Sequence, residues 1–215
     1  MSKHTLPDFF LQASKKLNIP LSEEAGLQFQ TYYQELITWN KKINLTRITE
    51  KKRFFIEHFI DSLIPERFIP SKSSLIDLGS GGGFPGLPLK IIRPDLSVTL
   101  VDSSLKKVMF LRYLIRLLSL RDIAVLQKRL KPHDFSTNRY DVCIGRAFAS
   151  LEKFLPLAFA FKNPQGIIIA MKGPNFLNEL KAAEPQLPLW GISLKQLKEF
   201  VLPFTNKQRA IIVFG

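Results

Sequence analysis

The sequence is poor in cysteine and histidine. Its 215 residues include one cysteine, Cys143, and three histidines. A single cysteine excludes an internal disulfide, which favours a reducing, cytoplasmic compartment. So few ligand side chains leave no spacing typical of a metal site. Cys143 lies within the apolar run YDVCIGRAF, so we expect a buried core thiol and not a nucleophile.

Long apolar runs are also missing. No segment reaches the roughly 18 uninterrupted apolar residues that cross a membrane. The start, MSKHTLPDFF, lacks the apolar centre of a signal peptide. We therefore expect a soluble intracellular protein with no membrane partner, and a hydrophobic content of 46% suits a substantial core.

Acidic residues are outnumbered. The chain holds 31 Lys and Arg against 18 Asp and Glu, so its formal net charge is +13 at pH 7. Such an excess favours a polyanionic partner, because each neutralised phosphate releases condensed counterions. A merely solvated basic surface would give the same composition, so charge alone leaves both interpretations open. The segments KKINLTR and EKKR are basic, and we expect them to form a strip that faces the polyanionic partner.

The chain divides into two regions of different pattern. Apolar spacing up to about residue 70 is helical, with Ser22 placed to cap a helix that continues to Ile43. EKKRFFIEHFIDSLI predicts a second amphipathic helix, and the prolines and serines of PERFIPSKSS mark a boundary. We predict a helical extension over residues 1–70, facing the polyanionic partner, and an α/β domain over residues 71–215.

Strand and helix signals alternate from residue 74 onward. Strands are predicted in SLIDLG, LSVTLVD, DIAVLQKR, YDVCIGRA and QGIIIAMKG, and helices in GLPLKII and SLKKVMFLRYLIRLLSL. The alternation predicts a mostly parallel sheet with helices on its faces. LKEFVLPFTNKQRAIIVFG predicts two further strands joined by a turn near Thr205 and Asn206. The fold class is therefore α/β and Rossmann-like, with seven strands and an antiparallel edge hairpin.

The stretch LIDLGSGGGFPGLPLK holds the strongest site signal. Ligands of open α/β sheets bind beyond the carboxyl ends of the strands, so the loop after the first strand is the expected site. Residues 81–86 satisfy the G-x-G-x-x-G dinucleotide fingerprint, a weak match in so glycine-rich a stretch. Asp77, followed by Gly79, Gly81 and Gly83, forms a longer pattern. That pattern is typical of S-adenosylmethionine binding in class I methyltransferases.

The two ligands make different demands on the loop. A dinucleotide needs helix N–H groups at its pyrophosphate, whereas S-adenosylmethionine carries an ammonium and a sulfonium that the Asp77 carboxylate can serve. Asp102 ends the second strand, where it can accept both ribose hydroxyls of either ligand. A cap at a helix or turn is the alternative for each acid. Phe84 is expected at the pocket mouth, against the methionine part or the adenine, with core packing as its alternative.

Longer motifs resemble a known family. DLGSGGGFPGLPL, LVDSSLKKVMFLRYL and YDVCIGRAFASL, with WNKKINLTRI, HFIDSL and MKG, closely resemble the bacterial small-subunit ribosomal RNA guanine-N7 methyltransferases, the glucose-inhibited division protein B family. The resemblance covers almost the whole chain. It implies methyl transfer from S-adenosylmethionine to N7 of one guanine in the 530 loop of 16S ribosomal RNA. We expect a metal-free monomer that acts on a small-subunit particle.

The resemblance also assigns residues. It implies donor contacts at Gly79 and Phe84, and contacts near adenine at Leu130 and Lys131. Relatives usually carry glutamate where this chain has Lys131, and a lysine cannot accept a hydrogen bond from the adenine amine. Any adenine contact there would come from the backbone. Arg146 matches an arginine at the end of the fourth strand in the family's donor site.

The residues after the fourth strand bear on the nucleophile. Enzymes that methylate exocyclic amines usually carry an Asn/Asp-Pro-Pro-aromatic block there, whereas this chain has GRAF. Guanine N7 already has a free lone pair, so Arg146 and Phe84 are expected to position the reactants without a general base. Arg146 would hold an RNA phosphate or the guanine edge, or alternatively pair with a carboxylate.

Other polar residues are weaker candidates. His58 and Asp61 are three apart on a predicted helix, and we expect a structural hydrogen bond between helices and sheet. Phe148 and Lys172 follow strands on the ligand side, where an RNA contact is possible.

Two other protein classes compete with this interpretation. A NAD-dependent oxidoreductase would need a catalytic Tyr/Lys or His arrangement at the strand ends, which the sequence lacks. A non-catalytic RNA-binding protein would leave an intact donor site unexplained.

Overall fold

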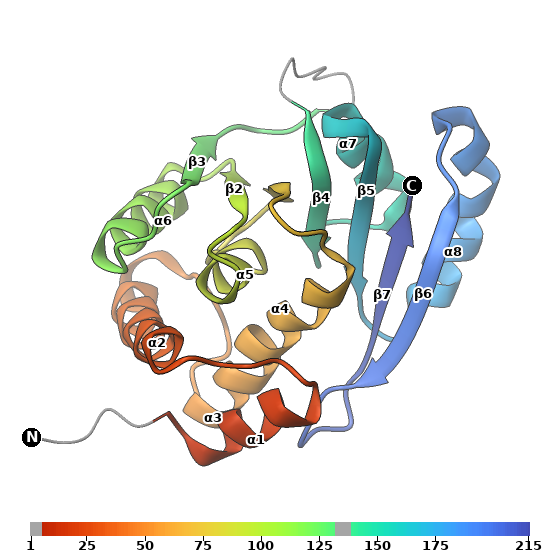
Figure 1. Cartoon of the computed structure of the whole chain (residues 1–215). Coiled ribbons are helices and arrows are strands. Elements are labelled where there is room, and N and C mark those ends of the chain that lie inside the picture. The colour runs from red at the N-terminus through yellow and green to blue at the C-terminus, as the bar shows by residue number, and fades with distance from the viewer. Residues whose placement is uncertain (1–5, 132–138) are drawn as a thin grey trace, which may run out of the picture.

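A computed structural model describes residues 6–131 and 139–215. The chain begins with a layer of helices (Figure 1). These are α1 (Asp8–Lys16), α2 (Glu23–Ile43), α3 (Lys51–Phe54), the π-helical turn η1 (Phe55–Ile60), α4 (Asp61–Leu63) and the 3₁₀ turn η2 (Ile64–Phe68). The predicted cap of α2 is confirmed, because the Ser22 hydroxyl accepts a hydrogen bond from the Ala25 N–H at 3.1 Å.

A seven-stranded mixed sheet follows. Its strands are β1 (Ser74–Leu78), β2 (Ser97–Asp102), β3 (Ile123–Gln127), β4 (Tyr140–Arg146), β5 (Lys162–Lys172), β6 (Leu194–Val201) and β7 (Gln208–Phe214). They lie in the order β3-β2-β1-β4-β5-β7-β6. The first five are parallel, and β7 runs antiparallel to both β5 and β6. The predicted parallel sheet with an antiparallel edge hairpin is therefore confirmed.

Helices cover both faces of the sheet. They are α5 (Gly86–Ile92), α6 (Leu105–Leu117), α7 (Leu151–Phe161), α8 (Phe176–Ala183) and the 3₁₀ turn η3 (Glu184–Trp190). Successive residues of a strand point to opposite faces of the sheet and belong to two separate hydrophobic clusters. Ile144 belongs to the cluster beneath α5 and α6, and its neighbour Cys143 belongs to the cluster beneath α7. Cys143 is fully buried, as predicted, and burial raises the pKa of its thiol.

The N-terminal helices are built into the first of these clusters. Phe10, Phe29 and Phe59 are fully buried in the same cluster as Leu87 of α5 and Val142 of β4. Their rings pack edge-on or tilted, with centroids 4.8 to 6.2 Å apart, which is a favourable arrangement for aromatic pairs. The helical segment is therefore a third layer over α5 and α6 and not a separate core.

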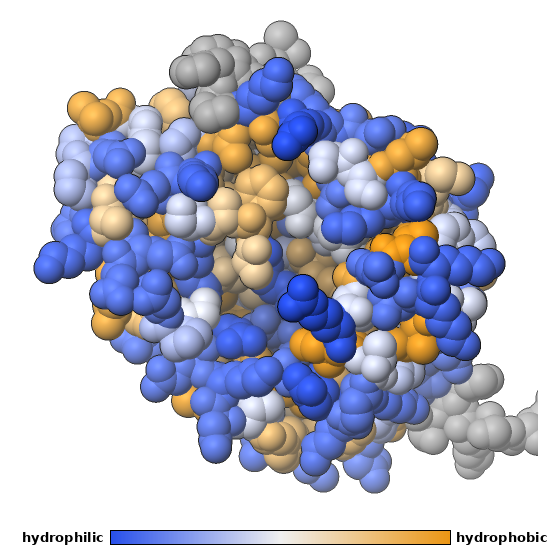
Figure 2. Space-filling view, turned by 180° about the vertical axis from the view of Figure 1, so that it is seen from behind, coloured by the Kyte–Doolittle hydropathy of each residue, from blue (hydrophilic) through white to orange (hydrophobic). Residues whose placement is uncertain are grey.

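The surface is predominantly hydrophilic. Figure 2 shows the face turned away from the viewer in Figure 1: hydrophilic side chains cover most of it, and it is hollowed near the middle. Within the described ranges, no helix is long and apolar enough to cross a membrane.

Tyr32 ties the helical layer to the loop that follows β1. The ring is fully buried on α2, and its hydroxyl donates a 2.5 Å hydrogen bond to the Gly82 carbonyl. The same ring stacks on Phe84 with centroids 5.5 Å apart and planes 6° from parallel. A single side chain thus meets the loop through both polar and apolar contacts.

Removing the Tyr32 hydroxyl should therefore destabilise the fold. In Tyr32→Phe the buried Gly82 carbonyl loses its partner, and we expect the free energy of unfolding to fall by about 1–3 kcal/mol. Urea unfolding monitored by circular dichroism measures the change. Tyr33→Phe is the matched control, because the Tyr33 hydroxyl bonds the Thr49 carbonyl at an exposed position. Equal losses in the two variants would contradict the assigned role of Tyr32.

Candidate active site

A cavity of about 790 Å³ opens where the carboxyl ends of the parallel strands meet the helical layer. Its walls come from the loop after β1, the α2–α3 connection, the helical segment around η1, the ends of β4 and β5 with the residues that follow them, and β7. The lining includes Leu45, Ile48, Glu57, His58, Asp61, Gly79, Ser80, Gly81, Gly82, Phe84, Arg146, Ala147, Ala149, Ser150, Met171, Lys172, Gly173, Asn175, Glu179 and Arg209.

Two glycines of the loop are required by its path. Gly79 has φ +78°, and a Cβ there would lie 2.0 Å from a ring carbon of Phe148. Gly83 has φ +107°, and a Cβ there would lie 2.4 Å from the Tyr32 hydroxyl oxygen. Side chains are excluded at both positions by conformation and by space. The loop backbone can therefore approach the cavity closely, as the glycine pattern predicts.

Asp77 lies beneath the loop and not in the cavity wall. It is fully buried, and its Oδ2 accepts a hydrogen bond from the Gly86 N–H at the start of α5, at 2.9 Å. Its Oδ1 has no hydrogen-bond partner among the described residues. Burial raises the pKa of Asp77 to about 7. This placement matches the alternative of a helix cap, and a direct contact between Asp77 and the donor stays an untested prediction.

Asp102 supports the loop from the next strand. Its Oδ2 accepts from the Gly81 N–H at 3.0 Å, and its Oδ1 accepts from the Ser104 N–H at 2.8 Å. It is 8% exposed, at the end of β2. Each carboxylate oxygen can accept a second hydrogen bond, so Asp102 both holds the loop and keeps acceptor capacity for ribose hydroxyls.

Phe84 and Arg146, predicted to position the reactants, come together in the cavity wall. The Phe84 ring stacks on His58, with centroids 4.6 Å apart, as well as on Tyr32. The Arg146 guanidinium carbon lies 4.9 Å from the Phe84 ring centroid. Phe84 is only 5% exposed, so it combines the two roles expected of it, core packing and an edge on the cavity.

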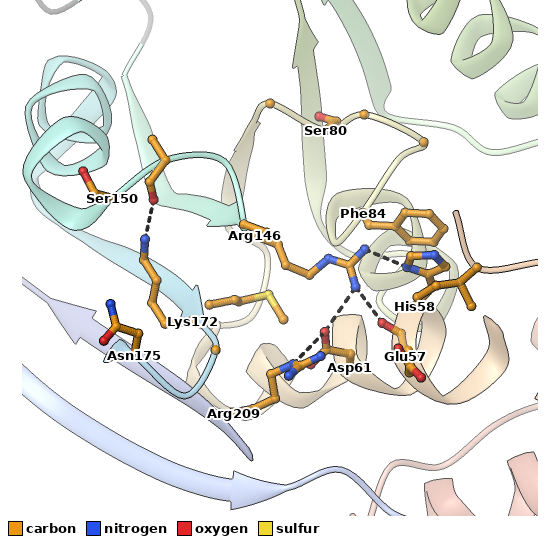
Figure 3. Close-up of a pocket in the computed structure, with 18 of the residues that line it drawn as sticks. Glu57, His58, Asp61, Ser80, Phe84, Arg146, Ser150, Lys172, Asn175 and Arg209 are labelled. Atoms are coloured by element: carbon orange, nitrogen blue, oxygen red, sulfur yellow. Dashed lines mark hydrogen bonds and ion pairs between the residues drawn. The ribbon is translucent and has the colours of Figure 1, made fainter. Parts of the chain in front are cut away.

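The Arg146 guanidinium is held by the helical layer (Figure 3). Its Nη1 donates to the Glu57 carbonyl at 2.9 Å and to Asp61 Oδ2 at 3.2 Å, and its Nη2 donates to His58 Nδ1 at 3.0 Å. Arg209 approaches the same carboxylate, with its Nε 3.3 Å from Asp61 Oδ1. Arg146 thus has the carboxylate partner that was the second of the two roles left open for it.

His58 connects three segments that lie far apart in the sequence. A guanidinium only donates, so His58 Nδ1 accepts from Arg146 and the proton resides on Nε2. Nε2 lies 2.7 Å from Thr46 Oγ1, and Asn40 holds the Thr46 backbone through two hydrogen bonds of 2.8 and 3.0 Å. Burial and the Arg146 charge lower the pKa of His58 to about 2. The predicted structural role of His58 between helices and sheet is confirmed.

The charged groups of the cavity are paired. Lys172 is buried and donates to the Ala149 carbonyl and, at 2.8 Å, to Glu179 Oε2. Glu57 accepts from Lys207 at 2.5 Å and from Arg53 at 3.0 Å. These hydrogen bonds hold the pKa of Glu57 below its ordinary value, although burial acts to raise it. Attraction for a polyanion must therefore come from the surrounding surface.

Besides Asp77, five predicted residues lie outside this cavity wall: Gly83, Asp102, Leu130, Lys131 and Phe148. Leu130 is partly buried and packs on the cluster beneath α7. Lys131 is exposed and adjoins residues 132–138, which are outside the described ranges. Phe148 is 38% exposed, over Gly79. The adenine contacts implied for Leu130 and Lys131 thus stay predictions.

Several cavity residues have no signal in the sequence. Glu57, Glu179 and Arg209 bring charge to the wall but carry no local motif. Arg209 is the second residue of β7, and a basic residue at the start of a strand is by itself a weak signal of a functional site. In the described part of the chain, no group of three or more His, Cys, Asp or Glu side chains is placed to hold a metal ion.

The arrangement of strands and loop defines the protein's class, which is that of the class I, S-adenosylmethionine-dependent methyltransferases. A S-adenosylmethionine-dependent methyltransferase of Aquifex aeolicus has the same fold, with a TM-score of 0.59 and 16% identity over 80% of this chain and 96% of that one. Coclaurine N-methyltransferase, solved with SAH, has a TM-score of 0.58 and 13% identity over 97% of this chain and 94% of that one. S-adenosylmethionine is the cofactor of this class of methyltransferases.

Within that class the chain belongs to the rRNA small subunit methyltransferase G family, whose model matches residues 26–212. A ribosomal RNA small subunit methyltransferase G of Syntrophus aciditrophicus is 40% identical over 212 residues, covering 95% of this chain and 87% of the relative. A relative of the same name from Desulforamulus reducens is 39% identical over 209 residues, covering 94% and 86%. The resemblance noted in the sequence is therefore confirmed, and the protein is a member of a ribosomal RNA methyltransferase family.

The Arg146–Asp61 pair allows a direct test of the site's construction. Asp61→Ala leaves two guanidinium groups facing a buried gap, so we expect the free energy of unfolding to fall by about 3–5 kcal/mol. Chemical denaturation at pH 7 measures the loss. Glu66→Ala is the control, because its pair with Arg93 is partly exposed and should contribute less than about 1 kcal/mol. In a double-mutant cycle with Arg146→Met, strictly additive losses would show that the pair is not coupled.

Proposed function

We propose that this protein transfers the methyl group of S-adenosylmethionine to N7 of a guanine in 16S ribosomal RNA. The observation that supports the donor site best is the glycine loop, closed against Asp102 at the edge where ligands of such sheets bind. Family membership supports the RNA substrate. The guanine, its N7 atom, a monomeric enzyme and a small-subunit particle as substrate are parts of the proposal.

The residues present fit the donor. Gly79 and Gly81 line the cavity. A Cβ at Gly81 would fill space that is open except for the Gly79 carbonyl oxygen, 3.9 Å away, and Asp102 retains acceptor capacity for ribose hydroxyls. When bound, S-adenosylmethionine supplies an electrophilic methyl carbon on a sulfonium. Gly79, Gly81 and Phe84 would adjoin it at the cavity. Asp77 would act through the loop that it caps, and the backbone near Leu130 and Lys131 would meet the adenine.

The acceptor side offers positioning groups, and its carboxylates Glu57, Asp61 and Glu179 are each engaged by a cation. His58 is the histidine of the cavity wall, and its two nitrogens are engaged with Arg146 and Thr46. Arg146 has five N–H donors, of which three are used within the described chain. The remaining two can hold an RNA phosphate or guanine O6. Guanine N7 needs no deprotonation, so this arrangement suits N7 better than an exocyclic amine.

The NAD-dependent alternative finds less support. The cavity wall contains no tyrosine among the described residues that line it. His58, which would have to exchange a proton with a hydroxy substrate, is held neutral with both nitrogens occupied. The described lining thus offers neither a tyrosine nor a free histidine nitrogen to exchange a proton during hydride transfer, so the methyltransferase assignment is the stronger one.

Asp102 provides the test of the donor site. Asp102→Ala removes the acceptor for the ribose and releases the Gly81 N–H, so affinity for S-adenosylmethionine should fall by about 1–3 kcal/mol. Isothermal titration calorimetry measures the affinity, with NAD as a ligand that neither protein should bind. Circular dichroism checks that the variant is folded. Wild-type affinity in the folded variant would refute the ribose assignment.

The pH dependence of the rate tests the mechanism. His58, with a pKa of about 2, is neutral throughout the physiological range and does not titrate there. Asp77, whose pKa burial raises to about 7, does titrate in this range, but it lies beneath the loop, outside the cavity wall, and saturating donor removes its effect on binding. We expect the single-turnover rate at saturating donor and RNA to stay nearly flat between about pH 6.5 and 8.5, because no general base is deprotonated. Catalysis would rest on alignment, which can supply up to about 7–11 kcal/mol.

A contrary pH profile would be easy to recognise. A limb of unit slope in that range, abolished by His58→Gln, Asp61→Asn or Asp77→Asn, would identify a titrating group that the reaction needs. It would overturn the mechanism and favour an amine as the methyl acceptor.

A further inference from the structure

The turn between β6 and β7 projects from the same sheet edge as the cavity. Ala210 of β7 pairs with Lys172 at the end of β5, and Gln208 pairs with Val201 at the end of β6. Residues 202–207 therefore lie beyond the carboxyl ends of the parallel strands. In Figure 1 this turn reaches the helical layer beside α1 and α3.

The turn between β6 and β7 carries an exposed phenylalanine, Phe204. Leu202 is fully buried and anchors the turn, and its carbonyl accepts from the Thr205 N–H at 3.1 Å and the Thr205 hydroxyl at 2.9 Å. Phe204 is 44% exposed and has φ +60°. A left-handed conformation is unfavourable for a bulky residue. Neither the exposure nor the conformation of Phe204 serves the hydrophobic core.

Cations surround this ring. Lys16 Nζ lies 4.7 Å from the Phe204 ring centroid, and Lys52 Nζ lies 5.8 Å from it. Lys207, in the same turn, is 43% exposed and bonds Glu57, a residue of the cavity wall. Lys207 thus connects the turn that carries Phe204 with a residue of the cavity wall.

From this arrangement we propose that Phe204, Lys16, Lys52 and Lys207, here named the Phe204 platform, bind single-stranded RNA beside the methylated nucleotide. One unpaired base stacks on Phe204 by displacing a lysine ammonium that lies over the ring, and the lysines then contact the adjacent phosphates. The proposal rests on the proposed function, because it assumes an RNA substrate. An exposed aromatic ring among cations suits a stacked base and its phosphates, since every base has a π-face and each phosphate a charge.

Fluorescence anisotropy with a labelled single-stranded RNA oligonucleotide tests the platform. Phe204→Ala should weaken binding about tenfold, equivalent to about 1.4 kcal/mol, whereas Phe204→Trp should retain it. Binding of the same sequence as an RNA duplex should not change, because a paired base cannot stack on the ring. Replacing Lys16 and Lys52 by alanine should flatten the salt dependence, with about 0.7 lost from the log–log slope per phosphate contact.

The matched control is Phe159→Ala. Phe159 is 36% exposed on α7, on the opposite face of the sheet, and its loss should leave RNA binding unchanged. Calorimetry with S-adenosylmethionine and thermal unfolding should not distinguish Phe204→Ala from wild type. Both readouts separate a lost RNA contact from a damaged fold.

The outcomes separate the platform from the proposed function. If wild type binds and methylates 16S ribosomal RNA and Phe204→Ala binds the single strand equally well, the platform is wrong and the function stands. An effect of Phe204→Ala only on assembled small-subunit particles would indicate a protein contact and would also overturn the platform. If wild type neither binds nor methylates RNA, the proposed function is wrong, and the platform, which assumes an RNA substrate, is wrong with it.

Discussion

The ion pair between Arg146 and Asp61 joins the two halves of the molecule. Arg146 ends the central strand β4, and Asp61 belongs to the helical layer. Their side chains are 14% and 5% exposed, so neither group can regain its hydration without separating the layers. Such a buried pair is costly to break from one side. The position of the helical layer over the glycine loop, and hence the shape of the cavity, depends on this contact.

The loop itself is fixed from two directions. Asp102 and Asp77 bind its backbone N–H groups from the sheet side. Tyr32 holds the Gly82 carbonyl and the Phe84 ring from the helical side. Because both sides make specific contacts, the loop needs little reorganisation to receive a ligand, which suits a reaction that depends on alignment.

Charge is divided between the cavity and the surface around it. Inside, Arg146 and Lys172 are neutralised by Asp61 and Glu179. The excess of +13 therefore acts at the exposed lysines, where it can attract a polyanion over a distance of about a Debye length. The surface would recruit the RNA, and the cavity would orient one base of it.

Local pattern was enough to predict the strands, the Ser22 cap, the edge hairpin, the buried thiol and the glycine loop, because each follows from neighbouring residues or a short period. Helix α7 carries no clear pattern, since it is apolar on most sides and contains Pro156. Asp61, the partner of Arg146, lies 85 residues away in the sequence. Pairing of β5, β6 and β7 brings Arg209 to the cavity and Phe204 to the turn beside it. Contacts across such separations depend on how the layers pack, so only the tertiary structure decided them.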